Sequence, residues 1–340
     1  MAYKEDILKV ASLDLPWEEL SGSNILITGA TGLIGSCLVE VLMSHKYRDY
    51  NIYASGRNEW RAKSKFKDYI NDPGFHFLKF DVTEKLNSNI NFKFIIHAAC
   101  DASPNFYATQ PVEVIKANMQ GVMNLMDYGL EHGLKRFLFV SSGEVYGEGD
   151  GRVFTEDYSG YVDCTKPRSC YPASKRAAES LCISYGVEYG IESVIARPCH
   201  IYGPGFTESD NRVFAQFIRN VLRHEDIIMK SAGSQFRSWC YSPDCASAIL
   251  HILLKGKNGA AYNIADESSN VSIKELAELI ADIGGRKVVI RIPNDSEKAG
   301  YSVVTKAVFS TDKLGGLGWK TMGTLKENFA NTIHFLQNLK

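Results

Sequence analysis

Short apolar runs alternate with longer amphipathic stretches along the first half of the chain. The short runs are rich in β-branched and aromatic residues, as buried strands are, whereas residues 111–131 repeat apolar positions at helical spacing. The predicted strands are 24–28, 51–55, 75–82, 94–99, 136–142 and 191–197. Strands that alternate with helices in this way are typical of a parallel sheet covered on both faces. We therefore predict an α/β fold with a Rossmann-type, doubly wound parallel sheet.

The pattern changes after Pro198. A loop containing glycine and proline, at 202–205, is followed by helical patterns at 212–223 and 273–283. These segments predict a smaller C-terminal lobe over the carboxyl edge of the sheet, where open α/β folds bind ligands. The predicted dinucleotide-binding domain comprises 20–198 and about 238–263, and the predicted smaller lobe comprises 199–237 and 264–340.

A turn rich in glycine lies between the first predicted strand and the helix after it. The segment Thr28-Gly29-Ala30-Thr31-Gly32-Leu33-Ile34-Gly35 follows an apolar strand and opens an apolar-periodic helix, which is the context of a dinucleotide-binding fingerprint. Gly29 would allow the tight turn, Gly32 would let a pyrophosphate approach the backbone, and Gly35 would let helix and strand pack closely. The helix N-terminus would hold the phosphates. The structural alternative is a plain strand-to-helix turn.

Tyr171 and Lys175 stand four residues apart, so on a helix they would share one face. The ammonium could then lower the pKa of the phenol and let it act as a base. A lone pair of this kind is common on solvated helices. It gains weight here from the glycine turn and from the hydroxyl pair Ser141-Ser142 upstream.

Composition narrows the function classes. The 340 residues suffice for one large α/β unit and a smaller one, and 38 Lys+Arg against 39 Asp+Glu leave no basic field to attract nucleic acid or an anionic membrane. The eight cysteines form no Cys-x-x-Cys pair, so we expect reduced thiols and no metal site. No apolar N-terminal stretch or run of membrane-spanning length is visible, and we expect a cytoplasmic protein.

In their order, these motifs resemble those of the extended short-chain dehydrogenase/reductases that act on nucleotide sugars, the NAD-dependent epimerase/dehydratase family. The resemblance covers residues 24–336. Besides the elements above, it rests on Asp81-Val82, His97-Ala98-Ala99, Asn118, the run Ser141-Ser142-Gly143-Glu144-Val145-Tyr146-Gly147, Arg197-Pro198, Tyr202-Gly203-Pro204, Arg237, Asp244, Tyr262-Asn263-Ile264 and Leu317-Gly318-Trp319.

The resemblance implies a tightly held NAD and a nucleotide sugar bound in the smaller lobe. Tyr171 would take the proton of a sugar hydroxyl, Ser142 would hydrogen-bond the same oxygen, and Lys175 would hold the nicotinamide ribose. Arg57 stands where NAD-preferring members usually carry an acid, so NADP stays possible, with NAD favoured. The implied cofactor-binding residues are Gly29, Thr31, Gly32, Leu33, Ile34, Gly35, Arg57, Asp81, Val82, Ala98, Ala99, Asn118, Tyr171, Lys175 and Pro198.

The residues after Ser142 bear on the reaction. A 4,6-dehydratase of this family carries Asp-Glu there and a 4-epimerase needs neither acid, whereas this chain has Gly143-Glu144. UDP-glucuronate decarboxylases also combine a small residue with Glu, and 167–176, 210–218 and 233–238 resemble that branch. The implied reaction is transient oxidation at C4 by bound NAD, followed by decarboxylation of UDP-glucuronate to UDP-xylose. The alternatives are an NDP-hexose 4-epimerase or 4,6-dehydratase, or an NADPH-dependent 4-keto-sugar reductase.

The same resemblance implies the substrate contacts and the assembly. Glu144 and Arg237 would serve the decarboxylation step, and Glu144, His200, Arg212 and Arg237 would contact the substrate. His200 replaces the asparagine usual in the decarboxylases. Helices at 112–131 and 172–188 correspond to those that pair into a four-helix interface in relatives, so a homodimer is expected.

Overall fold

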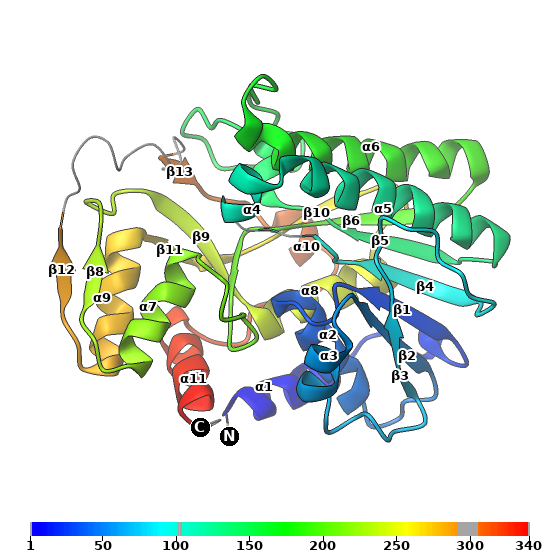
Figure 1. Ribbon diagram of the computed structural model, residues 1–340, viewed down its shortest axis with the longest axis horizontal. Coiled ribbons are helices and arrows are strands. Elements are labelled where there is room, and N and C mark those ends of the chain that lie inside the picture. The colour runs from blue at the N-terminus through cyan, green and yellow to red at the C-terminus, as the bar shows by residue number, and fades with distance from the viewer. Residues whose placement is uncertain (1, 101, 103, 292–304, 339–340) are drawn as a thin grey trace.

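The predicted doubly wound parallel sheet is confirmed. The computed structural model describes residues 2–100, 102, 104–291 and 305–338. Its largest sheet has seven parallel strands in the order β10-β6-β5-β4-β1-β2-β3 (Figure 1). These strands are β1 Asn24–Thr28, β2 Asn51–Gly56, β3 Phe75–Lys79, β4 Phe92–His97, β5 Arg136–Val140, β6 Glu192–Pro198 and β10 Ala261–Ile264. The strand order reverses between β1 and β4, and open α/β sheets bind ligands at such a switch point.

Two hydrophobic layers cover the two faces of this sheet. Ile25 and Ile27 of β1 belong to one layer and Leu26 to the other, and all three side chains are fully buried. Helices α1, α2, α3 and α8 cover the first face, and α4, α5 and α6 lie on the second (Figure 1). The helices are α1 Ala2–Ala11, α2 Leu33–Ser44, α3 Glu59–Lys65, α4 Pro104–Thr109, α5 Pro111–Glu131, α6 Cys170–Tyr189 and α8 Ser242–Lys255. In the described part of the chain, no helix combines the length and the apolarity needed to cross a bilayer.

A second group of elements lies beside the carboxyl edge of the main sheet, at the left of Figure 1. Strand β9 is its centre, because it pairs with β7, β11 and β13. The strands are β7 His200–Tyr202, β8 Ile227–Met229, β9 Phe236–Tyr241, β11 Asp266–Ser272, β12 Val288–Ile290 and β13 Lys306–Ala307. The helices of this group are α7 Val213–Leu222, α9 Ile273–Gly284 and α11 Leu325–Gln337. A short helix, α10 Asp312–Gly315, lies beside β10 of the main sheet (Figure 1). The 3-10 turns of the described residues are η1 Trp17–Leu20, η2 Gly143–Tyr146 and η3 Pro167–Ser169.

The division into two domains stays a prediction. Strand β9 runs across the predicted boundary at residue 237, and the predicted smaller lobe includes 292–304 and 339–340, which lie outside the described residues. The N-terminal helix α1 contacts both groups of elements. Its buried Asp6 accepts hydrogen bonds from Tyr241 Oη at 3.4 Å and from Asn331 Nδ2 at 3.1 Å. Helix α1 therefore helps to join the main sheet to the second group.

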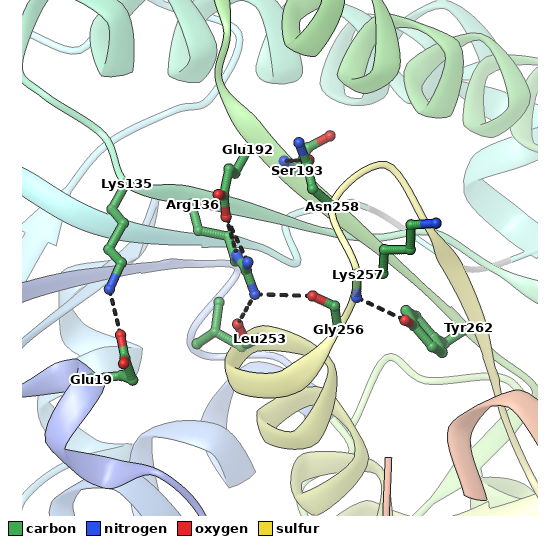
Figure 2. A network of polar contacts seen from close by, with 10 residues as sticks. All are labelled: Glu19, Lys135, Arg136, Glu192, Ser193, Leu253, Gly256, Lys257, Asn258 and Tyr262. Atoms are coloured by element: carbon green, nitrogen blue, oxygen red, sulfur yellow. Dashed lines mark hydrogen bonds and ion pairs between the residues drawn. The ribbon is translucent and has the colours of Figure 1, made fainter. Parts of the chain in front are cut away.

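At the amino edge of the main sheet, an arginine links two neighbouring strands to the end of helix α8, as Figure 2 shows. Arg136, the first residue of β5, donates from Nε and Nη2 to Glu192 of β6 at 3.0 and 2.6 Å. Its Nη1 donates to the carbonyl oxygens of Leu253 and Gly256, at the end of α8. These bonds satisfy carbonyls that a helix C-terminus leaves without intrahelical partners. The glycine turn lies at the opposite edge, after β1.

Asp244 is a fully buried carboxyl in the first turn of α8. Its Oδ1 accepts from the Met322 backbone N–H at 3.0 Å, whereas Oδ2 has no hydrogen-bond partner among the described residues. Burial raises the pKa of Asp244 to about 7, the Met322 bond opposes this shift, and the nearby acids Asp266 and Asp6 add to it. The folded protein therefore holds a proton here at pH values at which the unfolded chain has lost it.

This proton makes a testable prediction for Asp244→Asn. The wild-type protein binds more protons folded than unfolded between about pH 4 and pH 7, so Asp244 lowers the free energy of unfolding as pH rises through that window. The asparagine cannot titrate. Its stability relative to wild type should therefore improve by roughly 2 kcal/mol or more between about pH 5 and pH 8. Urea unfolding of both proteins at the two pH values measures this, and an equal pH response would contradict the prediction.

Candidate active site

The glycine turn after β1 forms a cradle in which backbone segments lie so close together that two of its glycines leave no space for a Cβ atom. Gly29 has a φ of +66°, and a Cβ there would lie 2.6 Å from the carbonyl oxygen of Ala98, after β4. A Cβ on Gly35, in the first turn of α2, would lie 2.4 Å from the Gly29 carbonyl oxygen. Both contacts are too short for any side chain. Gly32 is the N-cap of α2, so this helix begins close to the carboxyl end of β1, which is paired with β4.

Side chains from neighbouring strand ends border this cradle. Thr31 lies beside Gly56 at the end of β2, and Leu33 packs against Gly205 in the loop before α7. Arg57 follows β2 and Asp81 follows β3, with Arg57 Nη1 4.0 Å from Asp81 Oδ2. Asp81 Oδ1 is held by the backbone N–H and hydroxyl of Thr83. The remaining predicted cofactor residues of this region, Ile34, Val82, Ala98, Ala99 and Pro198, also lie in the first turn of α2 or at the carboxyl ends of β3, β4 and β6.

These features fit a dinucleotide. The cradle has backbone N–H groups at a helix start and no room for side chains, and a pair of opposite charges, Arg57 and Asp81, lies at the ends of the neighbouring strands. Which of these residues touch a cofactor stays a prediction.

Lys175 is buried beneath the carboxyl end of β5. Its Nζ donates to the Val140 carbonyl oxygen at 2.8 Å and lies 4.5 Å from the centre of the Phe139 ring. Burial lowers the pKa of the ammonium. Asn118 of α5 donates from Nδ2 to Ser174 Oγ at 2.9 Å, next to Lys175 in the chain, and its Oδ1 has no partner in the described part of the chain. In the structure, Asn118 thus ties α5 to the helix that carries the Tyr/Lys pair.

Tyr171 shares the helix face of Lys175, as the spacing predicts, and is buried. The expected lowering of its pKa by Lys175 is wrong for this arrangement of side chains. Burial raises the pKa of Tyr171, and the thiol of Cys100 and the carboxylate of Glu144 raise it further, against smaller opposing effects from Ser142 and Arg212. The Lys175 Nζ lies 5.8 Å from the ring centre, too far to offset desolvation.

Ser142 and Glu144 lie in the turn that follows β5. Ser142 Oγ accepts from the Glu144 backbone N–H at 3.2 Å and caps the short turn η2. Gly143 faces the ring of Phe309, since a Cβ on Gly143 would lie 2.3 Å from Phe309 Cζ. Phe309 is buried and its backbone N–H donates to Ser238 Oγ, next to Arg237. Phe309 thus links the turn that carries Glu144 to the strand that carries Arg237.

Three predicted substrate residues come from the second group of elements. Arg237 of β9 is buried, which lowers its pKa, and the charge of Glu144 opposes that shift. The side chain of His200, in β7, is partly accessible to solvent. Desolvation by the protein around it, and then the positive charges of Arg237 and Arg212, lower the pKa of His200 to about 3. Arg212 is engaged by Asp210, with Nη2 to Oδ2 at 2.5 Å. His200 is therefore a neutral hydrogen-bonding group near the cationic Arg237.

The fold and these motifs agree with a comparison against known families. A family model described as the NAD dependent epimerase/dehydratase family matches residues 25–265. The chain belongs to the NAD dependent epimerase/dehydratase family. The match runs from β1 to the end of β10 and includes the glycine turn, Ser142, Tyr171 and Lys175.

Similar proteins carry two kinds of name. UDP-glucuronic acid decarboxylase 6 of Arabidopsis thaliana is 36% identical over 266 residues, which cover 77% of this chain and 75% of that protein. UDP-glucuronic acid decarboxylase 5 of the same organism is 34% identical over 313 residues, 90% of this chain and 87% of that protein. The solved structure of a dTDP-glucose 4,6-dehydratase from Streptomyces venezuelae with NAD and TYD bound has a TM-score of 0.79 at 21% identity, covering 93% and 97%. That likeness shows a shared fold.

Two residues beside Glu144 were missed by sequence reasoning. Arg168 of η3 donates from Nη2 to both carboxylate oxygens of Glu144, each at 2.8 Å. Tyr107 of α4 lies between Arg168 and Tyr171, stacked on the Tyr171 ring at 4.8 Å between centroids. Arg168 lies just before the helix that carries Tyr171 and Lys175. This closeness in the chain was the one feature of the sequence that could have indicated Arg168 as a site residue. Tyr107 lies in a segment with no predicted element.

A buried ion pair holds the Tyr/Lys helix against the strand ends. Glu179, one turn after Lys175, receives two bonds from Arg197 at 3.0 and 2.7 Å and one from Ser141 Oγ at 2.5 Å. Arg197 also donates to Tyr146 Oη at 3.1 Å. Because these groups come from α6, β6 and the turn after β5, the network fixes the position of Tyr171 relative to Ser142.

The contact between Gly143 and Phe309 makes a second prediction. The backbone of Gly143 is outside the left-handed region, so Gly143→Ala adds only the clash of its methyl group with a buried ring. We expect Gly143→Ala to lower the free energy of unfolding by roughly 1–3 kcal/mol. Phe309→Leu should recover part of that loss in the double variant, since it removes ring atoms from the clash. Urea unfolding of the four proteins measures the coupling, and additive effects would argue against the packing described.

Proposed function

We propose that this protein decarboxylates UDP-glucuronate to UDP-xylose, with NAD as an internal redox group. The observation that carries the proposal is the single carboxylate of Glu144, placed next to Ser142 and within the field of the buried Arg237 guanidinium. Position 143 is closed to a second acid by Phe309. The names of the similar decarboxylases support the same reaction.

The chain's own groups suit the proton transfers of this reaction. Tyr171 would accept the proton of the sugar C4 hydroxyl while Ser142 hydrogen-bonds the same oxygen. NAD, when bound, supplies the hydride acceptor and, in its oxidised form, a positive charge that favours the tyrosinate. Lys175, already held beneath β5, would contact the cofactor ribose. Because burial raises the pKa of Tyr171, its role as a base depends on added positive charge.

Oxidation at C4 would make the substrate a β-keto acid. The C5–C6 bond then breaks, its electron pair moves toward the C4 carbonyl oxygen, and the carboxylate leaves as carbon dioxide. A proton must reach C5 before the hydride returns to C4, and we assign Glu144 to assist that transfer. Arg237 would hold the carboxylate or the diphosphate, since a guanidinium fork suits either anion.

We propose NAD rather than NADP. Asp81 lies beside Arg57, so a 2′-phosphate brought to Arg57 would also meet a carboxylate. The solved dehydratase with NAD bound supports the same choice.

The experiment is incubation of the purified protein with UDP-glucuronate, with and without added NAD. Carbon dioxide release and the mass of the nucleotide sugar are followed together, and the cofactor released on denaturation is identified by mass. We expect carbon dioxide, a UDP-pentose and released NAD. Unchanged UDP-glucuronate would overturn the proposal, and turnover of a nucleotide hexose would then favour a 4-epimerase or 4,6-dehydratase, whereas consumption of NADPH would favour a 4-keto-sugar reductase.

In the same assay Arg237→Ala should reduce turnover by about 30-fold or more, because it removes a charge-assisted hydrogen bond worth ~2 kcal/mol. Arg237→Lys keeps the charge but loses the planar fork, so it should recover only part of the rate. Near-normal kinetics of Arg237→Ala would remove this residue from the mechanism. Arg286→Ala is a control, since Arg286 bonds backbone carbonyls on α9 and near the end of α7.

We also propose that the protein is a homodimer through α5 and α6. Val122 and Met126 of α5 are fully buried core residues, whereas Val112 and Ile115 of the same helix are 59% and 42% exposed. Apolar side chains on an outer helix face are typical of a protein interface. Light scattering should give twice the monomer mass, and Ile115→Glu should give the monomer, because it would bury a charge. Leu8→Glu, an exposed site on α1, is the control, and a monomeric wild type would end the proposal.

A further inference from the structure

Arg168 and Glu144 form an ion pair at an open side of the site. The Arg168 side chain is 50% exposed and that of Glu144 is 41% exposed, so both can be reached from solvent. Both hydrogen bonds to Glu144 come from a single nitrogen of Arg168, Nη2. A guanidinium carries further N–H donors on Nη1 and Nε, in the same plane. The pair therefore leaves one edge of the guanidinium for another acceptor.

A stack of rings holds this guanidinium close to the reacting tyrosine. The Cζ atom of Arg168 lies 4.5 Å from the centre of the Tyr107 ring. Tyr107 is buried and is stacked on Tyr171, with centroids 4.8 Å apart and an interplanar angle of 25°. Stacking fixes the plane of the guanidinium without using its N–H groups. Arg168 is thus held one ring away from the Tyr171 phenol and keeps its donors at the rim.

Guanidiniums from two separate segments act on Glu144. Arg168 forms an ion pair with it, and the charge of Glu144 also acts on the buried Arg237 of β9. In a region partly shielded from water, guanidiniums that converge in this way favour the approach of an anion.

We propose that Arg168 recognises the sugar carboxylate of the substrate, and that Glu144 and this carboxylate share the one guanidinium. The inference rests on the proposed function and deepens it, since it assigns the choice of an acidic sugar over a neutral one to a particular residue. A bidentate or shared arginine contact discriminates between a carboxylate and a hydroxymethyl group of similar size. Arg237 is then available for the diphosphate.

The test is equilibrium binding in a Tyr171→Phe background, which keeps the stacked ring and removes the phenol that turnover requires. Isothermal titration with UDP-glucuronate and UDP-glucose compares an acidic with a neutral sugar on the same nucleotide. We expect the background protein to prefer UDP-glucuronate by about tenfold or more. Adding Arg168→Ala should remove this preference, to within about twofold, while UDP-glucose binds as before. Arg168→Lys should keep part of it.

Arg152→Ala is the matched control. Arg152 also pairs with a carboxylate, Asp150, and lies over a tyrosine ring, Tyr158 at 5.5 Å, in the loop after η2. It should leave the preference intact. A preference that survives Arg168→Ala would overturn this inference and leave the proposed function standing. Equal loss of both ligands would also overturn it, because Arg168 would then support the site rather than read the carboxylate. If the Tyr171→Phe protein shows no preference for UDP-glucuronate over UDP-glucose, the proposed function, with UDP-glucuronate as substrate, is contradicted.

Discussion

The candidate site depends on one close approach between backbone segments. Gly29 lies against the chain after β4, and Gly35 lies against Gly29, at distances that leave no space for a Cβ atom. These contacts set where α2 begins and how near its N-terminus comes to the carboxyl ends of β1 and β4. The other predicted cofactor residues lie near the same edge, because the strands are parallel and their carboxyl ends meet there.

A second constraint acts behind the reacting groups. Glu179 and Arg197 form a buried, doubly hydrogen-bonded pair that also engages Ser141. Loss of one partner of such a pair leaves a buried charge, which typically costs about 3–5 kcal/mol. The pair therefore gives α6 one position relative to the turn that carries Ser142 and Glu144. The proposed action of Tyr171 and Ser142 on one substrate oxygen requires that position.

Members of one fold can catalyse different reactions, because the reaction is decided by a few side chains. The groups that we propose to decide the reaction come from three separate segments. Glu144 comes from the turn after β5, Arg168 from the turn before α6, and Arg237 from β9 in the second group of elements. The ring of Phe309 brings the first and third together, since it packs on Gly143 and its backbone bonds Ser238. The shape of the reacting region is thus built by contacts between distant parts of the chain.

The sequence by itself determined the parallel sheet, the glycine turn and the helix face shared by Tyr171 and Lys175, because these follow from local periodicity and backbone sterics. Only the fold decided which apolar residues of α5 are core, since Val122 and Met126 are fully buried whereas Val112 and Ile115 are exposed. The direction of the Tyr171 pKa shift was decided by burial, and burial is a property of the whole packing. The same holds for the Arg168 bond to Glu144, the ring of Tyr107 and the ion pair that occupies Arg212, since such contacts join residues whose separation in the chain carries no signal of their distance in space.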